Sequence, residues 1–193
     1  MYNEADGSRK AEDMKEMHDF VTKNGETVSL RPAVPDDAGE MINTIRSTAL
    51  ERSYVLMEQY GKDAEAEKRY ITEMDRQHNL LLVAVVKGVV VGSLAALQSD
   101  GGRRPLTAHI LSIGLHLIKG YRGLGIGSQM LTYAAEWAKE QGFKKMEASI
   151  FTTNKRSLNL FSNVGFKEEG TRRKQFRIGS DFIDEVFMAK FIE

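Results

Sequence analysis

Tyr121-Arg122-Gly123-Leu124-Gly125-Ile126-Gly127-Ser128 joins two predicted elements of this 193-residue chain. An apolar run ends just before it at Ile118, and an amphipathic helical pattern begins near Ser128. The first N–H groups of a helix have no partner inside the helix, and the helix dipole adds partial positive charge there. Glycine lets the backbone approach an anion closely, and Arg122 supplies a cation with a forked set of donors. A strand, a glycine-rich turn and a helix in this order predict a phosphate site.

Three kinds of phosphate-binding turn fit this description in part. A P-loop requires Lys-Ser or Lys-Thr after its last glycine, whereas Ser128-Gln129 stands here. A dinucleotide-binding turn requires glycine at positions 123, 125 and 128, and position 128 is Ser. The third pattern, Arg/Gln-x-x-Gly-x-Gly/Ala, is met by Arg122, Gly125 and Gly127. A turn that merely lets strand and helix pack closely is the remaining alternative.

Composition excludes several classes of protein. Basic and acidic residues both number 27, so the net charge indicates neither a nucleic-acid partner nor a membrane surface. The chain has no cysteine, which excludes a disulfide scaffold, a thiol nucleophile and thiolate metal sites. No long apolar run or signal peptide opens the chain, so we expect a cytoplasmic protein. The spacing of His, Asp and Glu suggests no metal site.

Periodicity and turn residues predict one domain. Residues 1–17 are polar and charged and are expected to form an N-terminal arm, and residues 18–193 form the domain. The expected strands cover residues 19–23, 26–31, 80–86, 89–97, 107–118, 143–151, 167–178 and 182–191. The expected helices cover residues 35–49, 63–76, 125–141 and 154–164. This order predicts an α/β (α+β) fold with a central mixed, mostly antiparallel sheet and helices on both faces.

Two motifs give the chain a resemblance to the GNAT superfamily of acetyl-CoA-dependent N-acetyltransferases. The first runs from His109 through Ile113-Gly114-Leu115 to the glycine-rich turn, and is similar to the family's fourth strand and pyrophosphate loop. The second is Asn154-x-x-Ser157-x-x-Leu160-Phe161-x-x-x-Gly165-Phe166, which resembles the family's Asn-x-x-Ala-x-x-Leu-Tyr-x-x-x-Gly-Phe. The resemblance covers roughly residues 27–192. It implies a splay between the fourth and fifth strands of the family, the strands 107–118 and 143–151 here.

The resemblance implies where acetyl-CoA would bind. The pantetheine arm would lie in the splay as an extra strand, paired with the backbone of Leu115 and Leu117, and an N–H near Leu115 would stabilise the oxyanion. The residues implied to contact the cofactor are Leu115, His116, Leu117, Arg122, Gly123, Leu124, Gly125, Ile126, Gly127, Ser128, Asn154, Ser157 and Phe161.

Acetyl transfer also needs a general base for the amine and an acid for the leaving thiolate. The family's usual acid is the Tyr of the second motif, which is Phe161 here and cannot donate a proton. The base candidates are His116, His109 and Glu147, of which His116 lies closest to the reacting centre by strand position. A histidine that is only a structural residue, or proton loss through ordered water, is the alternative. Tyr54, Met57 and Tyr60 fall where the family builds its acceptor pocket, and they could equally be core residues.

The expected function is transfer of an acetyl group from acetyl-CoA to a primary amine of a small molecule, amino acid or peptide, by direct attack in a ternary complex. The alternatives are a protein N-acetyltransferase of the ribosomal type and, because of Phe161, a non-catalytic acyl-CoA-binding module. We expect no nucleic acid, membrane or metal partner, and leave a homodimer open. The basic run Arg172 to Arg177 indicates a solvated sheet edge or a face toward an acidic substrate.

Overall fold

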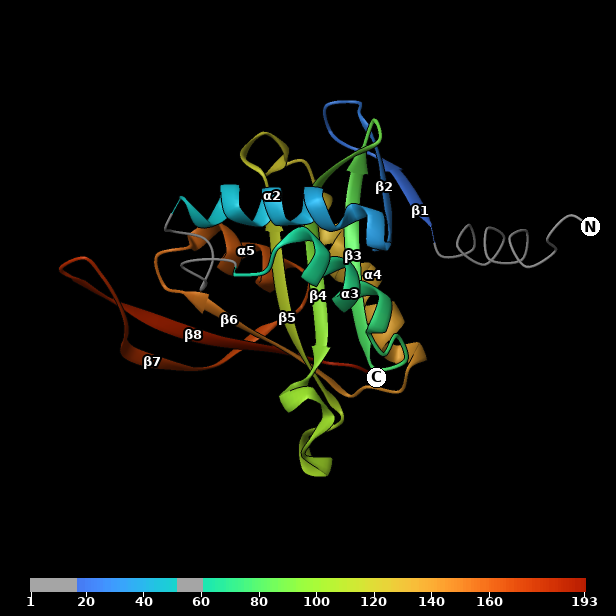
Figure 1. The fold of residues 1–193 in the computed structure, drawn as a ribbon. Coiled ribbons are helices and arrows are strands. Elements are labelled where there is room, and N and C mark those ends of the chain that lie inside the picture. The colour runs from blue at the N-terminus through green and yellow to red at the C-terminus, as the bar shows by residue number, and fades with distance from the viewer. Residues whose placement is uncertain (1–16, 52–60) are drawn as a thin grey trace, which may run out of the picture.

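The computed structural model describes residues 17–51 and 61–193, and these form one eight-stranded sheet with helices on both faces (Figure 1). The strand order is β1-β2-β3-β4-β5-β6-β8-β7, and only β5 and β6 are parallel. The strands are β1 (His18–Val21), β2 (Thr27–Pro32), β3 (Asn79–Val86), β4 (Val89–Gln98), β5 (Ile110–Leu117), β6 (Lys145–Phe151), β7 (Lys167–Ile178) and β8 (Asp181–Phe191). The helices are α2 (Ala38–Ala49), α3 (Ala64–Glu73), α4 (Ile126–Glu140) and α5 (Lys155–Asn163). The predicted mixed, mostly antiparallel sheet is confirmed.

Most expected elements are present, and the turn between β1 and β2 is the clearest difference. Val21 pairs with Thr27, so the connection is longer than the expected two-residue Asn24-Gly25 turn. The Thr22 side chain explains this, because its hydroxyl accepts the Glu26 N–H at 3.1 Å while the Thr22 carbonyl accepts from Gly25, so the reciprocal ladder bond between Thr22 and Glu26 is not made. Residues 1–16 of the expected arm lie outside the described part of the chain.

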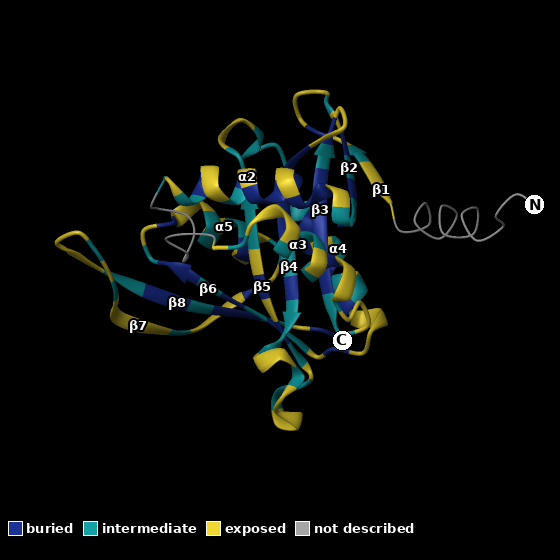
Figure 2. Ribbon diagram, in the orientation of Figure 1, coloured by how far each residue is buried: buried dark blue, intermediate teal, exposed yellow. Residues whose placement is uncertain are grey.

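Alternation along β3 places the core on both faces of the sheet. Leu82 and Ala84 belong to a buried cluster that includes Met130 of α4. Leu81 and Val83 point the other way, into a cluster that contains buried side chains of α2 and α3. Figure 2 shows β3 and β4 buried between these two layers of helices. A strand covered on both faces needs a continuous apolar sequence, as residues 80–86 provide.

The sheet opens between β5 and β6. These strands pair only from Ile110 with Lys145 to Ser112 with Glu147, and then diverge (Figure 1). Each strand keeps its other neighbour, since β5 stays paired with β4 as far as Leu117 and β6 with β8 along its whole length. The expected splay is therefore confirmed.

The opening leaves backbone groups of β5 without a strand partner. Ile118 donates its N–H to Val91 on the β4 side. In an antiparallel pair, alternate residues point their N–H and C=O groups to opposite sides. Leu115 and Leu117 therefore direct these groups into the splay.

Within residues 17–51 and 61–193, no helix is long and apolar enough to cross a membrane.

Gly92 on β4 packs directly against β5 beside the opening and leaves no room for a side chain. A Cβ at Gly92 would lie 2.4 Å from the His116 carbonyl oxygen and 2.6 Å from Leu117 Cδ2, whereas one at Gly114 on β5 would meet nothing within 4 Å. We expect Gly92→Ala to lower the free energy of unfolding by about 1–3 kcal/mol, because backbone must shift. The matched control Gly114→Ala should change it by less than about 0.5 kcal/mol. Denaturant unfolding measures both, and equal effects would contradict this packing.

Candidate active site

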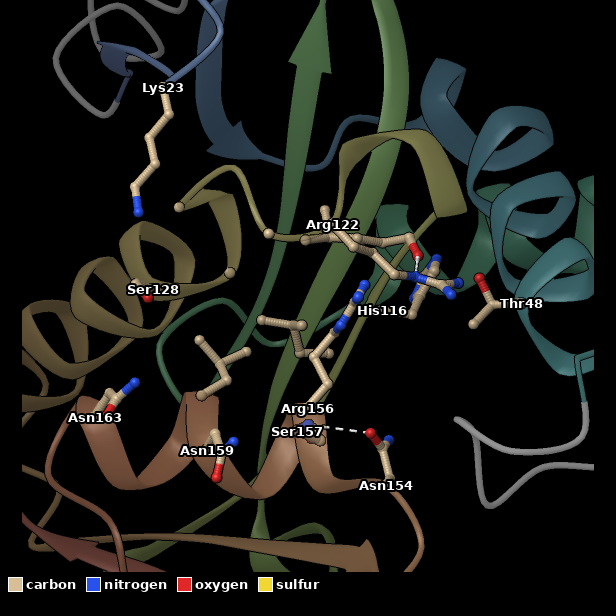
Figure 3. A pocket seen from close by; sticks show the side chains of 16 residues that line it. Lys23, Thr48, His116, Arg122, Ser128, Asn154, Arg156, Ser157, Asn159 and Asn163 are labelled. Atoms are coloured by element: carbon tan, nitrogen blue, oxygen red, sulfur yellow. Dashed lines mark hydrogen bonds between the residues drawn. The ribbon is translucent and has the colours of Figure 1, made fainter.

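A cavity of about 460 Å³ lies where β5, α4 and α5 meet, and it extends to Thr48 at the end of α2 (Figure 3). It brings together most of the residues that the sequence assigned to the cofactor. The lining residues are Lys23, Thr48, Leu115, His116, Leu117, Arg122, Gly123, Gly125, Gly127, Ser128, Asn154, Arg156, Ser157, Asn159, Leu160 and Asn163.

The glycine-rich turn opens the N-terminus of α4 toward this cavity. Gly123 and Gly125 have φ of +80° and +94°, in the left-handed region that favours glycine. The first α4 bond within the helix runs from Gln129 N–H to Gly125 O at 3.2 Å, so the N–H groups of residues 126–128 precede the helical ladder. Leu124 and Ile126 pack against the core, and only their backbone faces the turn. The turn thus has the geometry of an anion site.

Gly127 serves a different purpose from the two left-handed glycines. A Cβ there would lie 2.9 Å from Leu160 Cδ2 of α5 and 3.8 Å from Leu115 Cδ2. Gly127 is therefore needed for the close packing of α4 on α5, and it also lines the cavity. It lets α4 approach α5 and so narrows the cavity.

Arg122 is held by the protein rather than directed at open space. Its guanidinium makes two hydrogen bonds to the Glu51 carboxylate, at 2.8 and 2.6 Å, and its Nε donates to the Leu117 carbonyl at 2.6 Å. These bonds lower the pKa of Glu51 below its ordinary value. The pair ties the end of α2 to the turn and occupies the Leu117 carbonyl, which leaves the Leu117 N–H directed into the splay. That Arg122 touches pyrophosphate stays a prediction.

Two other cations at the cavity were missed by the sequence analysis. Lys23, from the β1–β2 connection, and Arg156, from the first turn of α5, extend their side chains from opposite sides of the cavity (Figure 3). A basic residue in the first turn of a helix opposes the helix dipole. Lys155-Arg156 directly after the Asn154 cap was therefore a signal for an anion nearby.

The second motif forms the floor of the cavity. Asn154 caps α5, since its Oδ1 accepts the Ser157 N–H at 3.0 Å, which leaves its amide nitrogen as donor. Phe161 is 3% exposed and packs edge-on against Phe166, with ring centroids 4.9 Å apart. It is absent from the cavity lining, to which the neighbouring Leu160 contributes instead. Phe161 therefore packs in the core behind the cavity, and its contact with the cofactor stays a prediction.

His116 lies at the far end of the cavity with both ring nitrogens engaged. The Thr44 hydroxyl donates to the Met41 carbonyl at 2.8 Å, so its oxygen accepts from His116 Nε2–H at 2.9 Å. Nδ1 is then the acceptor for the Ser93 hydroxyl at 3.4 Å. Burial, and secondly the charge of Arg122, lower the pKa of His116 to about 4. The ring is neutral at pH 7 and is held as a structural histidine would be.

The other base candidates lie elsewhere. His109 is exposed just before β5, at the closed end of the splay. Glu147 pairs with Ser112 at the last residue before the strands part, and neither side chain lines the cavity. The acceptor residues Tyr54, Met57 and Tyr60 fall outside the described residues. In the part of the chain that the structure describes, no three His, Asp or Glu side chains are placed to hold a metal ion.

Several known proteins are similar to the chain in sequence or in fold. One relative, the L-amino acid N-acetyltransferase AaaT of Escherichia coli, is 26% identical over 120 residues, which is 60% of this chain and 70% of that protein. The N-alpha-acetyltransferase RimI of Mycobacterium tuberculosis is 30% identical over 122 residues, 63% of this chain and 73% of RimI. A phosphinothricin acetyltransferase from Sinorhizobium meliloti, solved in complex with AcCoA, superposes with a TM-score of 0.77 at 23% identity, covering 86% of this chain and 88% of that one.

The family assignment follows from sequence and fold together. The model of the acetyltransferase (GNAT) family matches residues 45–166, more than half of the chain and all of the cavity floor and glycine-rich turn. The fold agrees with this match, including the parted strands. The chain therefore belongs to the GNAT family of acetyltransferases.

Proposed function

We propose that the chain binds acetyl-CoA in this cavity and transfers its acetyl group to a primary amine of a small molecule, amino acid or peptide, in the cytoplasm. One observation supports this most: the open start of α4 and the unpaired edge of β5 line the same cavity. An anion and an extended amide-containing chain can both be bound there with backbone groups alone. Acetyl-CoA has both parts, a diphosphate and a pantetheine arm.

The residues fit the two halves of the cofactor. The N–H groups that open α4 would hold the diphosphate, with Lys23 and Arg156 neutralising its charge. Leu115 and Leu117 would pair with the pantetheine amides, and the Asn154 amide nitrogen would donate to a pantetheine carbonyl. The Leu115 N–H, directed into the splay, would bond the thioester oxygen and stabilise the negative charge that develops on it.

The departure of the thiolate needs no tyrosine in this proposal. The leaving thiol has an ordinary pKa of roughly 8.5, so it can leave as an anion near neutral pH when positive groups lie close. Phe161 is thus compatible with catalysis. The relatives act on different amines, as their names state: L-amino acids for AaaT and an N-alpha amine for RimI. A protein acceptor, and a homodimer, stay predictions.

Release of CoA thiol from acetyl-CoA with a panel of primary amines tests the proposal, alongside calorimetric binding of acetyl-CoA. We expect binding and amine-dependent thiol release. Binding without turnover on any amine would favour the acyl-CoA-binding module instead. No binding would refute both.

Ser128 offers a sharper test of the diphosphate site than the glycines do. Gly125 is left-handed and Gly127 is packed against Leu160, so substitution there would disturb the fold as well. Ser128 is the third residue of α4, where an acidic side chain stabilises a helix by about 0.3–1 kcal/mol. We expect Ser128→Asp to weaken acetyl-CoA binding by about 10- to 100-fold through charge repulsion, without lowering Tm.

The matched control is Ser128→Asn, which has nearly the same shape and no charge. Its dissociation constant for acetyl-CoA should stay within about threefold of the wild type. If calorimetry gave equal affinities for the Asp and Asn variants, no diphosphate would lie at the start of α4.

His116 is expected to make folding sensitive to acid. Its pKa is about 4 in the folded protein and about 6.5 when unfolded, so only the unfolded chain gains this proton between those values. Its contribution to stability is complete above pH 6.5 and is lost as the pH falls toward 4, by about 3 kcal/mol. We expect His116→Gln to remove this part of the pH dependence of the unfolding free energy. Exposed His109→Gln should keep it, and identical profiles for the two variants would contradict the assignment.

Phe161→Tyr tests whether this ring contacts the cofactor. Because Phe161 packs on Phe166 outside the cavity lining, we expect the acetyl-CoA dissociation constant to change by less than about threefold. Calorimetry measures it. A loss of more than about tenfold would show that α5 is seated differently from the structure.

A further inference from the structure

A buried carboxylate lies beside the splay and has no part in the scheme above. Glu185 of β8 is 5% exposed, and its Oε1 accepts from the Ser149 hydroxyl of β6. Its Oε2 is also buried and accepts no hydrogen bond among the described residues. An unsatisfied buried carboxylate oxygen is costly, since desolvation is not offset by a donor. Such an atom indicates a site for a cation or donor.

The Arg172 guanidinium lies near Oε2 but makes no close hydrogen bond with it. Arg172 of β7 approaches it with Nη1 at 3.5 Å, beyond the 2.7–2.9 Å usual for a charge-assisted hydrogen bond. The same guanidinium lies 4.4 Å from the centre of the Phe187 ring, and the side chain is 61% exposed. Only the Arg172 side of this pair is exposed, so the guanidinium can leave Oε2 when another cation takes its place beside the buried carboxylate.

Glu185 points to the face of the sheet opposite to α4 and α5. Met146, Ala148 and Ile150 of β6 point into the cluster with α4 and α5. By alternation Ser149 and Glu185 point to the other face, where His116 meets α2. The cofactor cavity opens on the α4 and α5 side, so the two ligands would approach the splay from opposite faces.

Counting residues from the last β5–β6 pair places Glu185 near the level of His116. Ser112 pairs with Glu147, and His116 lies four residues further along β5, as Phe151 does along β6. Phe151 is the β8-facing partner of Glu185. Glu185 therefore lies on β8, one strand beyond β6, on the far side of the opening from β5. Of the base candidates from the sequence, His116 lies at the same level but has both ring nitrogens engaged, and His109 and Glu147 lie toward the closed end of the splay.

We propose that Glu185 and Arg172 form the acceptor site for an α-amino acid, in which Glu185 holds the ammonium group and accepts its proton and Arg172 holds the α-carboxylate. This inference rests on the proposed acetyl transfer. Ammonium and carboxylate stand two bonds apart in an α-amino acid, which suits insertion between two opposite charges that already face each other. The ammonium replaces the guanidinium at Oε2, and the guanidinium turns to the carboxylate.

The proton and electron balance is complete with these groups. The Glu185 carboxylate takes one ammonium proton, and the nitrogen lone pair that is freed forms a bond to the thioester carbonyl carbon. The C–S bond breaks and its electron pair leaves with the sulfur. A second proton on nitrogen passes to the thiolate, which gives the N-acetyl amino acid and CoA thiol, and Glu185 returns its proton to solvent.

The experiment uses the full chain and the protein L-amino acids as acceptors, each beside the amine that lacks its α-carboxylate. For the best acceptor we expect Glu185→Gln to lower kcat/KM by about 100-fold or more, with acetyl-CoA affinity unchanged. Arg172→Gln should raise KM for the amino acid by about tenfold and leave kcat/KM for the amine without a carboxylate within about threefold. The charge-matched control is Glu168→Gln, an exposed carboxylate on the same hairpin, which should resemble the wild type.

Three outcomes overturn the inference: equal activity of the Glu185 and Glu168 variants, equal turnover of amino acids and their decarboxylated partners, or an unchanged KM in Arg172→Gln. Arg172 is a surface residue, so its variant remains informative if Glu185→Gln fails to fold. If the wild type acetylates no amine, the proposed function itself fails. Calorimetry of the same amino acids with CoA-bound protein then tests the acceptor site formed by Glu185 and Arg172 without turnover. Binding that both variants lose supports this site, and no binding to the wild type refutes it.

Discussion

The parting of β5 from β6 is the constraint on which the rest of this structure depends. A sheet that stays closed uses all of its backbone donors and acceptors, and offers a ligand only side chains. Here the two strands share three residue pairs and then separate, and each is kept in place by its other neighbour. Unpaired backbone groups of a strand are costly in isolation and useful beside an extended ligand. The opening is therefore both a weakness of the fold and the source of its binding site.

Several interactions hold the opening in shape. The Arg122–Glu51 pair fixes the turn to the end of α2, and its third bond restrains the Leu117 carbonyl at the edge of the opening. His116 ties β5 to α2 and β4 through Thr44 and Ser93. Because both ring nitrogens are hydrogen-bonded, the ring links these three elements in a fixed geometry. Polar contacts thus do at the open end what strand pairing does elsewhere in the sheet.

The fold was readable from the sequence because local patterns agreed with the global arrangement. The run 80–86 has no polar residue and became a strand buried on both faces, and Lys87-Gly88 gave the tight hairpin, with φ of 50° and 82°. The β1–β2 turn was misjudged because a threonine hydroxyl competes with the ladder, an effect that dipeptide preferences do not contain. Thr44 and Thr48 are buried on α2, and their polar side chains gave no sign of this in the sequence.

The part of the candidate site that is formed by backbone conformation could be predicted from the sequence. The part that depends on side chains from different strands could not. Glycine spacing fixes the left-handed turn, so the anion site could be located from residues 121–128 alone. Glu185 could not, because it needs the β6–β8 register and the irregular β7–β8 pairing that brings Arg172 opposite it. The two faces of the sheet beside the opening differ in charge. Lys23 and Arg156 lie on the face that carries α4 and α5, and the buried Glu185 carboxylate lies on the opposite face. A polyanionic cofactor and a cationic amine would each be drawn to a different face, and the gap between β5 and β6 is where they would meet.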